Sequence, residues 1–141
     1  MRKILAAAAI LASVALLAAG GAAAQPSSSL SLVVLGTSGG AAVQPHAGSQ
    51  VTFQLQTSAS QPWVSVACYQ NGIAVYGQYW GFWNGYSPSV ITSTMAAGGV
   101  FTVGQTPLWS SGAANCVATL YTVSRNYKQT TLATLGFAVA G

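Results

Sequence analysis

Residues 63–80 read WVSVACYQNGIAVYGQYW, and this stretch decides the fold. Positions of alternating character along 63–70 are typical of a half-buried β-strand. Asn71-Gly72 follows, and this dipeptide is the strongest short-range signal for a two-residue hairpin turn. A second strand-like run, 73–80, returns after the turn. The stretch therefore predicts an antiparallel β-hairpin.

Similar strand signals recur along the chain. Short runs of alternating or β-branched apolar residues lie at residues 30–34, 51–56, 100–103, 114–123 and 131–139. Residues 36–50 are rich in Gly and Ala and predict a loop, while Asn84-Gly85 marks a further turn in the least legible stretch. No segment after the first 24 residues carries a helical period with caps. This spacing predicts an all-β fold, either an antiparallel β-sandwich, which we expect, or a small closed barrel.

The first 24 residues have the composition of an export signal. A short basic segment precedes a run of apolar or small residues, and Ala22-Ala23-Ala24 offers an A-x-A cleavage site. We expect residues 1–24 to be a cleaved signal peptide and residues 25–141 to be one domain, secreted or held in the cell envelope. The alternative is an uncleaved anchor, since residues 4–24 are barely long enough to span a bilayer. No second run approaches that length, so no other membrane contact is expected.

The chain lacks the residues of most catalytic sites. It contains no Asp or Glu, and His46 is its one histidine. Carboxylates are the usual general acids and bases, the usual orienters of a catalytic histidine and the usual ligands for hard cations. No G-x-S-x-G sequence occurs, and His46 lies in the expected loop, where a solvated residue is ordinary. We therefore expect a protein that is not an enzyme and has no cofactor or metal site.

Few charges remain after the expected signal peptide, where Arg125 and Lys128 are the only ionic side chains. Two cations cannot neutralise a phosphate track, so no nucleic-acid partner is expected. Both lie in an expected turn between the last two strands, where charges on a solvated tip are ordinary. Such a weakly charged surface also has little repulsion to prevent self-association.

Cys68 and Cys116 are the two cysteines of the chain. In an exported protein a disulfide is the expected state of such a pair. A metal site is the poorer alternative because no third or fourth ligand accompanies them. In the chain-entropy model the loop that this disulfide closes contributes about 4 kcal/mol of stability.

Three segments together resemble bacterial and phage immunoglobulin-like domains: GSQVTF at 48–53, WVSVACYQNG at 63–72 and GAANCVATLY at 112–121. The resemblance implies an immunoglobulin-like β-sandwich of secreted actinobacterial type. It also implies a binding or spacer module on surface proteins, and it supplies no catalytic residue. The chain departs from antibody-type domains because Ala114 stands where a tyrosine corner would place Tyr. In addition, Cys68 lies on the third strand of the pattern, not the second.

In that pattern the third and sixth strands are neighbours in one sheet. The disulfide Cys68–Cys116 would then join adjacent antiparallel strands within a sheet instead of linking the two sheets. We expect both cysteines to face the core. Alternation places four further side chains inward with them: Val64, Val66, Ala118 and Leu120.

The same register predicts an outer aromatic face. With the cysteines opposite each other, Tyr121 lies opposite Trp63. A two-residue turn also pairs Trp63 with Trp80, and it pairs Cys68 with Val75. The expected binding face carries five rings: Trp63, Trp80, Tyr121, Tyr76 and Tyr69. Exposed aromatic patches often mark binding sites, and flat rings suit sugars or a protein partner, so the expected partner is a glycan or a cell-surface protein.

A structural interpretation of these rings stays open. Aromatic residues stabilise strands without any ligand, and a one-residue slip in register would turn every ring into the core. A second aromatic group is open to the same interpretation, as core filling around an irregular strand end: Tyr79, Trp80, Phe82, Trp83 and Tyr86. Trp109 is expected to pack at the corner before the strand 114–123. Two functions remain, a recognition module and a self-assembling surface protein whose strands pair with further copies.

Overall fold

The computed structural model describes residues 28–37, 43–83 and 99–141. Seven strands form these segments: β1 (Ser29–Val34), β2 (Gln50–Gln56), β3 (Trp63–Gln70), β4 (Ile73–Gly81), β5 (Phe101–Thr102), β6 (Ala114–Val123) and β7 (Gln129–Val139). The expected signal peptide and the expected turn at Asn84-Gly85 lie outside the described residues.

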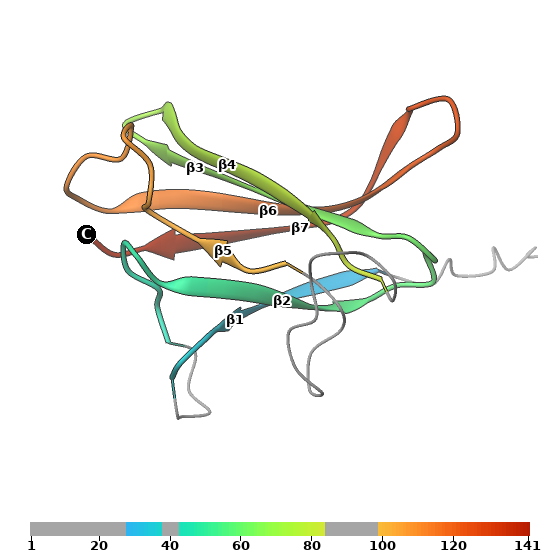
Figure 1. Cartoon of the computed structure of the whole chain (residues 1–141), viewed down its shortest axis with the longest axis horizontal. Coiled ribbons are helices and arrows are strands. Elements are labelled where there is room, and N and C mark those ends of the chain that lie inside the picture. Colours follow the sequence, from blue (N-terminus) through green and yellow to red (C-terminus); the bar gives the residue numbers. More distant parts are fainter. Residues whose placement is uncertain (1–27, 38–42, 84–98) are drawn as a thin grey trace, which may run out of the picture.

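The strands form two antiparallel sheets, one of three strands in the order β1-β2-β5 and one of four in the order β4-β3-β6-β7 (Figure 1). This all-β, two-sheet arrangement is compatible with the expected β-sandwich. The described segments contain no helix, and so none of membrane-spanning length and hydrophobicity. β3 and β6 have the predicted bounds, whereas β5 is shorter than the predicted strand at 100–103.

The hairpin that the sequence predicts is present at the start of the four-stranded sheet. Asn71 and Gly72 connect β3 to β4 with φ angles of 50° and 79°. Positive φ at both central residues defines the type I′ turn, whose twist matches that of the flanking strands. The turn pairs Gln70 with Ile73, as a two-residue loop requires.

The disulfide is also confirmed. Cys68 and Cys116 are directly opposite each other on β3 and β6, with their Cα atoms 4.0 Å apart, and their sulfurs are bonded. Both residues are buried on the inner face of the sheet. The four side chains predicted to face inward with them are each no more than 1% exposed: Val64, Val66, Ala118 and Leu120.

The two sheets meet through phenylalanine rings. Phe53 of β2 packs edge-on against Phe101 of β5, with ring centroids 5.6 Å apart, and also contacts Phe137 of β7 at 6.2 Å. Phe82 stacks on Phe101 at 6.5 Å and is 4% exposed. Phe82 therefore fills the core, as expected for that position, and Trp109 likewise packs against the core.

Gln70 attaches the end of β3 to the segment that leads into β6. Its side-chain NH₂ donates to the carbonyl oxygens of Ser110 (2.9 Å) and Gly112 (3.1 Å). Its Oε1 accepts from both the backbone N–H and the hydroxyl of Ser110, each at 3.0 Å. Gln70 is only 7% exposed, and these four bonds satisfy its buried amide.

Candidate binding face of the four-stranded sheet

A bulge between β3 and β4 changes the predicted register. Cys68 pairs with Tyr76, whereas the two-residue turn predicts Val75 as its partner, and the register shifts between Cys68 and Tyr69. Val75 is the extra residue. Its side chain is buried, and its carbonyl oxygen accepts a hydrogen bond from the Thr106 hydroxyl. The bulge is therefore accompanied by a contact with a segment far along the chain. The sequence of residues 63–80 contains no local signal that predicts this bulge.

The predicted pairing of Trp63 with Trp80 is consequently wrong. Trp63 pairs with Gly81, and Trp80 pairs with the inward-facing Val64. Because side chains alternate between the faces of a strand, one extra residue reverses the faces of all residues beyond it. Trp80 and Tyr76 thus belong to the inner face, where Trp80 packs against the core and Tyr76 is 8% exposed.

Tyr76 is consequently a buried phenol. Its hydroxyl donates to Oε1 of Gln78 at 2.6 Å. Burial raises the pKa of Tyr76 from 10.0 to about 12, because the phenolate would lose its hydration. The fold therefore favours the neutral form of this side chain.

Alkaline titration tests this placement. A folded-state pKa above the ordinary value stabilises the protein fully below pH 10, and this contribution is lost as the pH rises from 10 to about 12. The phenolate absorbance of Tyr76 is the difference between the titrations of the wild type and of Tyr76→Phe. We expect this difference to develop near pH 12. A difference step centred near pH 10 would contradict the inward position.

The outer face carries a different aromatic cluster, centred on Trp63. As predicted, Trp63 lies opposite Tyr121, and the two rings stack with centroids 6.5 Å apart at 19°. The indole also contacts Tyr79 at 6.0 Å and Trp83 at 5.0 Å. We call these four residues the Trp63 cluster. Such tilted and edge-on contacts suit the charge distribution of aromatic rings.

Strands β3, β4 and β6 and the segment that follows β4 supply the Trp63 cluster, and the bulge in β4 completes it. The bulge that turns Trp80 inward turns Tyr79 outward, where it is 63% exposed. Gly81, opposite Trp63, has no side chain to separate the rings. Tyr121 is 8% exposed and forms the base of the cluster. The sequence left Tyr79 and Trp83 open to interpretation as core filling, and only knowledge of the bulge would have placed Tyr79 with Trp63.

Tyr69 lies on the outer face as predicted, but at the other end of the sheet. It pairs with Ala74 and Asn115 and is 40% exposed. Of the five rings predicted to form one face, the structure therefore brings together Trp63 and Tyr121, sets Tyr69 apart and turns Tyr76 and Trp80 inward.

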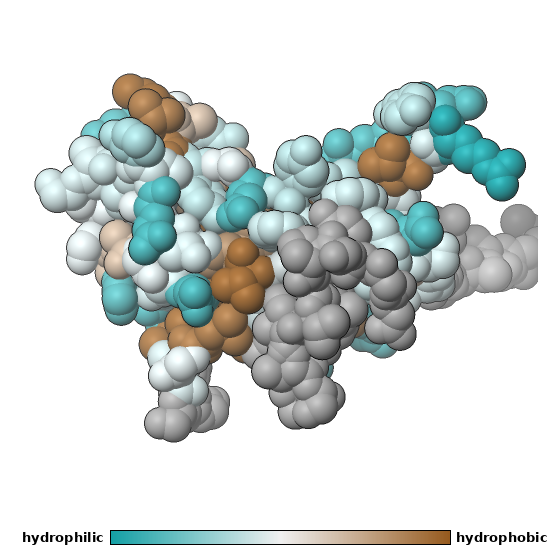
Figure 2. Space-filling view, viewed as in Figure 1, coloured by the Kyte–Doolittle hydropathy of each residue, from teal (hydrophilic) through white to brown (hydrophobic). Residues whose placement is uncertain are grey.

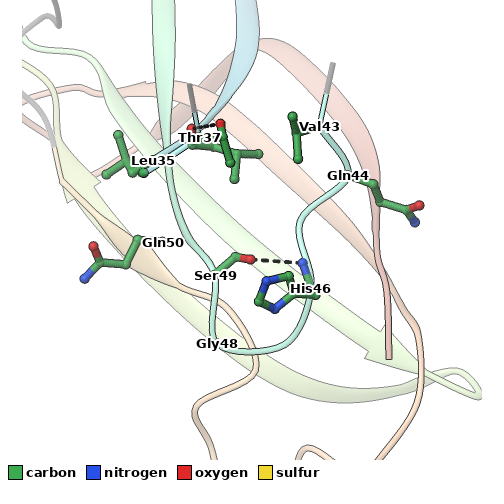
Figure 3. Close-up of a pocket in the computed structure, with 10 residues that line it drawn as sticks. Leu35, Thr37, Val43, Gln44, His46, Gly48, Ser49 and Gln50 are labelled. Atoms are coloured by element: carbon green, nitrogen blue, oxygen red, sulfur yellow. Dashed lines mark hydrogen bonds between the residues drawn. The ribbon is translucent and has the colours of Figure 1, made fainter. Parts of the chain in front are cut away.

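A cavity of about 410 Å³ lies beside the segment between β1 and β2 (Figure 3). His46 lines it, is exposed, and directs Nδ1 at the carbonyl oxygen of Ala47 at 2.9 Å, so Nδ1 is the donor. The nearby Ser49 hydroxyl accepts the backbone N–H of His46 at 3.0 Å. These bonds are local turn contacts, and neither joins the hydroxyl to the imidazole as a nucleophile and its base require.

Comparison with known proteins yields no family: no protein-family model, no curated protein and no solved structure matches the chain. Within 28–37, 43–83 and 99–141, no group of three or more His, Cys, Asp or Glu side chains lies together as metal ligands would. Among the described residues, the Trp63 cluster is the surface feature whose side chains are best suited to contact a ligand.

Proposed function

We propose that this protein is an exported, non-catalytic recognition module that binds a glycan or a surface protein through the Trp63 cluster. One observation carries the proposal. Trp63 holds three further rings on the outer face of the four-stranded sheet, and one of these, Tyr79, is 63% exposed. A ring held by neighbouring rings loses little conformational entropy on binding, and its flat face fits a sugar ring or a protein anchor.

Export is supported by the disulfide and by the first 24 residues. A bonded, buried Cys68–Cys116 pair is characteristic of proteins from oxidising compartments. The basic segment and A-x-A sequence of the N-terminal residues fit a secretory signal. Both features favour a place outside the cytosol.

The strand order supports an immunoglobulin-like form of the sandwich. β1-β2-β5 would correspond to strands A, B and E, and β4-β3-β6-β7 to strands C′, C, F and G. In this scheme the disulfide joins C to F, and the Trp63 cluster lies on the outer C–C′–F surface.

A glycan array and a panel of cell surfaces test the proposal with three proteins: the wild type, Tyr79→Ala and Tyr69→Ala. Both variants remove an exposed tyrosine from the same sheet face, but only Tyr79 belongs to the Trp63 cluster. We expect Tyr79→Ala to weaken binding about tenfold or more, as the loss of one stacked ring does, and Tyr69→Ala to bind like the wild type. Equal loss in both variants, or loss in Tyr69→Ala alone, would place the site elsewhere.

Self-assembly is the second candidate, and the composition of β4 favours it. β4 is one of the two edge strands of its sheet, contains no charged residue or proline, and exposes 68% of Ile73. Strands of this kind pair with strands of other copies. Sedimentation of the same wild-type sample separates the candidates. Assembly that increases with protein concentration, together with no binding on the glycan array, would favour the structural role over recognition.

A further inference from the structure

The β6–β7 hairpin extends past the rest of its sheet. Trp63 and Tyr121 form the last pair between β3 and β6, but β6 continues to pair with β7 as far as Val123 and Gln129. The register shifts between Leu120 and Tyr121, and such bulges bend a strand. Figure 1 shows the end of the hairpin bending away from β1, β2 and β5. The hairpin therefore rises at the same end of the sheet as the Trp63 cluster.

Hydrogen bonds hold the tip in one conformation. The N–H of Tyr127 donates to the carbonyl oxygen of Ser124, and the N–H of Ser124 donates to that of Lys128, both at 2.9 Å. The Ser124 hydroxyl accepts the N–H of Lys128 at 3.2 Å. A turn closed by three residues, with a left-handed residue at its end, has this pattern. The side chains of the tip thus project from an ordered loop.

Tyr127 occupies the left-handed position of this turn, with φ at 58°. Glycine and asparagine are the usual residues there, and a bulky residue is strained. Packing does not offset the strain, because the side chain is 91% exposed. A strained, solvent-exposed aromatic residue on an ordered loop is a feature of functional sites. The ring is therefore better explained by a contact outside the domain than by the stability of the fold.

The tip also concentrates charge. Arg125 and Lys128 flank Tyr127, and they are the only ionic side chains in the described parts of the chain. In Figure 2 the end of the hairpin carries hydrophilic side chains and stands clear of the body. With no carboxylate anywhere in the sequence, neither cation has an acidic side chain to pair with. The positive charge of the tip is therefore directed at solvent or at an anionic partner.

We propose that this tip binds the acidic groups of a polysaccharide, and that the ligand class of the protein is a polyuronate or a similarly acidic glycan. This inference rests on the proposed function, because the same polymer would reach the Trp63 cluster from the tip. The Arg125 guanidinium matches a carboxylate in two-point geometry, Lys128 supplies a second cation, and the Tyr127 ring suits a sugar face. The side chain of Asn126, also exposed, offers an amide to hydroxyl groups.

An anionic membrane fits the tip less well. Stable electrostatic attachment to a bilayer uses clusters of four to eight basic residues, whereas the tip has Arg125 and Lys128. Insertion requires a broad apolar surface, and Val123 is the one aliphatic side chain exposed near the turn. A polymer with one carboxylate on each sugar instead offers paired charge and ring contacts within the reach of a single hairpin.

Affinity electrophoresis tests the inference with polygalacturonate and with the same polymer after its carboxyl groups have been reduced to alcohols. We expect the wild type to bind the acidic polymer, and to bind it more weakly as salt is added, since salt screens exposed charges. Arg125→Gln/Lys128→Gln should raise the dissociation constant about tenfold. Tyr127→Gly should also weaken binding while raising Tm by about 4 °C, because it relieves the strained φ.

Three outcomes would overturn the inference: equal binding to the acidic and reduced polymers, unchanged binding by Arg125→Gln/Lys128→Gln, or binding to vesicles containing phosphatidylserine in place of the polymer. Tyr79→Ala separates the two proposals. If a neutral glycan binds to the wild type and to the tip variants but not to Tyr79→Ala, the proposed function is supported and the inference of an acidic ligand is rejected. If Tyr79→Ala binds polygalacturonate like the wild type and the tip variants do not, the tip is supported as the binding site and the Trp63 cluster is rejected.

Discussion

Replacement of both cysteines in Cys68→Ala/Cys116→Ala is expected to lower the free energy of unfolding by about 4 kcal/mol. The two residues are separated by 48 positions in the chain, so the disulfide removes a large loop-closure entropy from the unfolded state. A loss of this size is a substantial fraction of the 5–15 kcal/mol that stabilises a typical domain.

Urea denaturation measures this effect. The m-value should rise together with the loss of stability, because an unfolded chain without the cross-link exposes more surface. Wild-type protein kept in excess reductant serves as the control and should unfold at nearly the same urea concentration as the double variant. A loss below about 1 kcal/mol would show that the unfolded chain already brings these two segments together.

Gly99→Ala is expected to have an effect of similar size through overpacking. A Cβ atom built on Gly99 lies 1.9 Å from Cγ and 2.3 Å from Cβ of Trp80, far inside van der Waals contact. The indole cannot withdraw freely, because it packs against the core, and the Thr52 hydroxyl holds the carbonyl of Gly99 at 2.9 Å. We expect the added methyl group to lower the free energy of unfolding by about 3 kcal/mol, the upper end of the usual range for overpacking.

Gly136→Ala is the matched control, since a Cβ at this position of β7 meets no atom within 4 Å. It should change stability by no more than about 0.5 kcal/mol. The clash can also be isolated by a double-mutant cycle with Trp80→Gly, which removes every Trp80 atom near the added methyl group, so that Gly99→Ala should cost much less in that background. Equal melting temperatures for Gly99→Ala and Gly136→Ala would refute the close contact with Trp80.

Local pattern was sufficient for β3 and β6, and their pairing followed from the strand order of the immunoglobulin-like resemblance together with the two cysteines. The alternation of 63–70, the Asn71-Gly72 turn and the two cysteines together determine which faces are buried, and Cys68 and Cys116 allow only one register between the strands. Trp63 and Tyr121 follow from that register by counting residues of fixed period. This half of the Trp63 cluster was therefore predictable.

The other half of the Trp63 cluster depends on the bulge at Val75. This bulge is accompanied by contacts with residues far along the chain. A regular hairpin continued from Asn71-Gly72 places Tyr76 and Trp80 outside, and the local sequence is compatible with that register. The alternative buries Tyr76 and Trp80 against the core and gives the Val75 carbonyl to Thr106. Burial of two large rings and hydrogen bonding of a backbone carbonyl lower the free energy through contacts between distant segments. The periodicity of the local sequence therefore cannot predict them.

By itself the sequence determined an all-β chain, its principal strands, its disulfide and a surface almost without charge, because these depend on period, turn residues and composition. Only the tertiary structure decided which rings of β4 reach the surface and how far the β6–β7 hairpin carries Tyr127 from the body. Both depend on single-residue bulges. A bulge is selected by the free energy of packing across the whole domain, and one extra residue reverses every side chain that follows it.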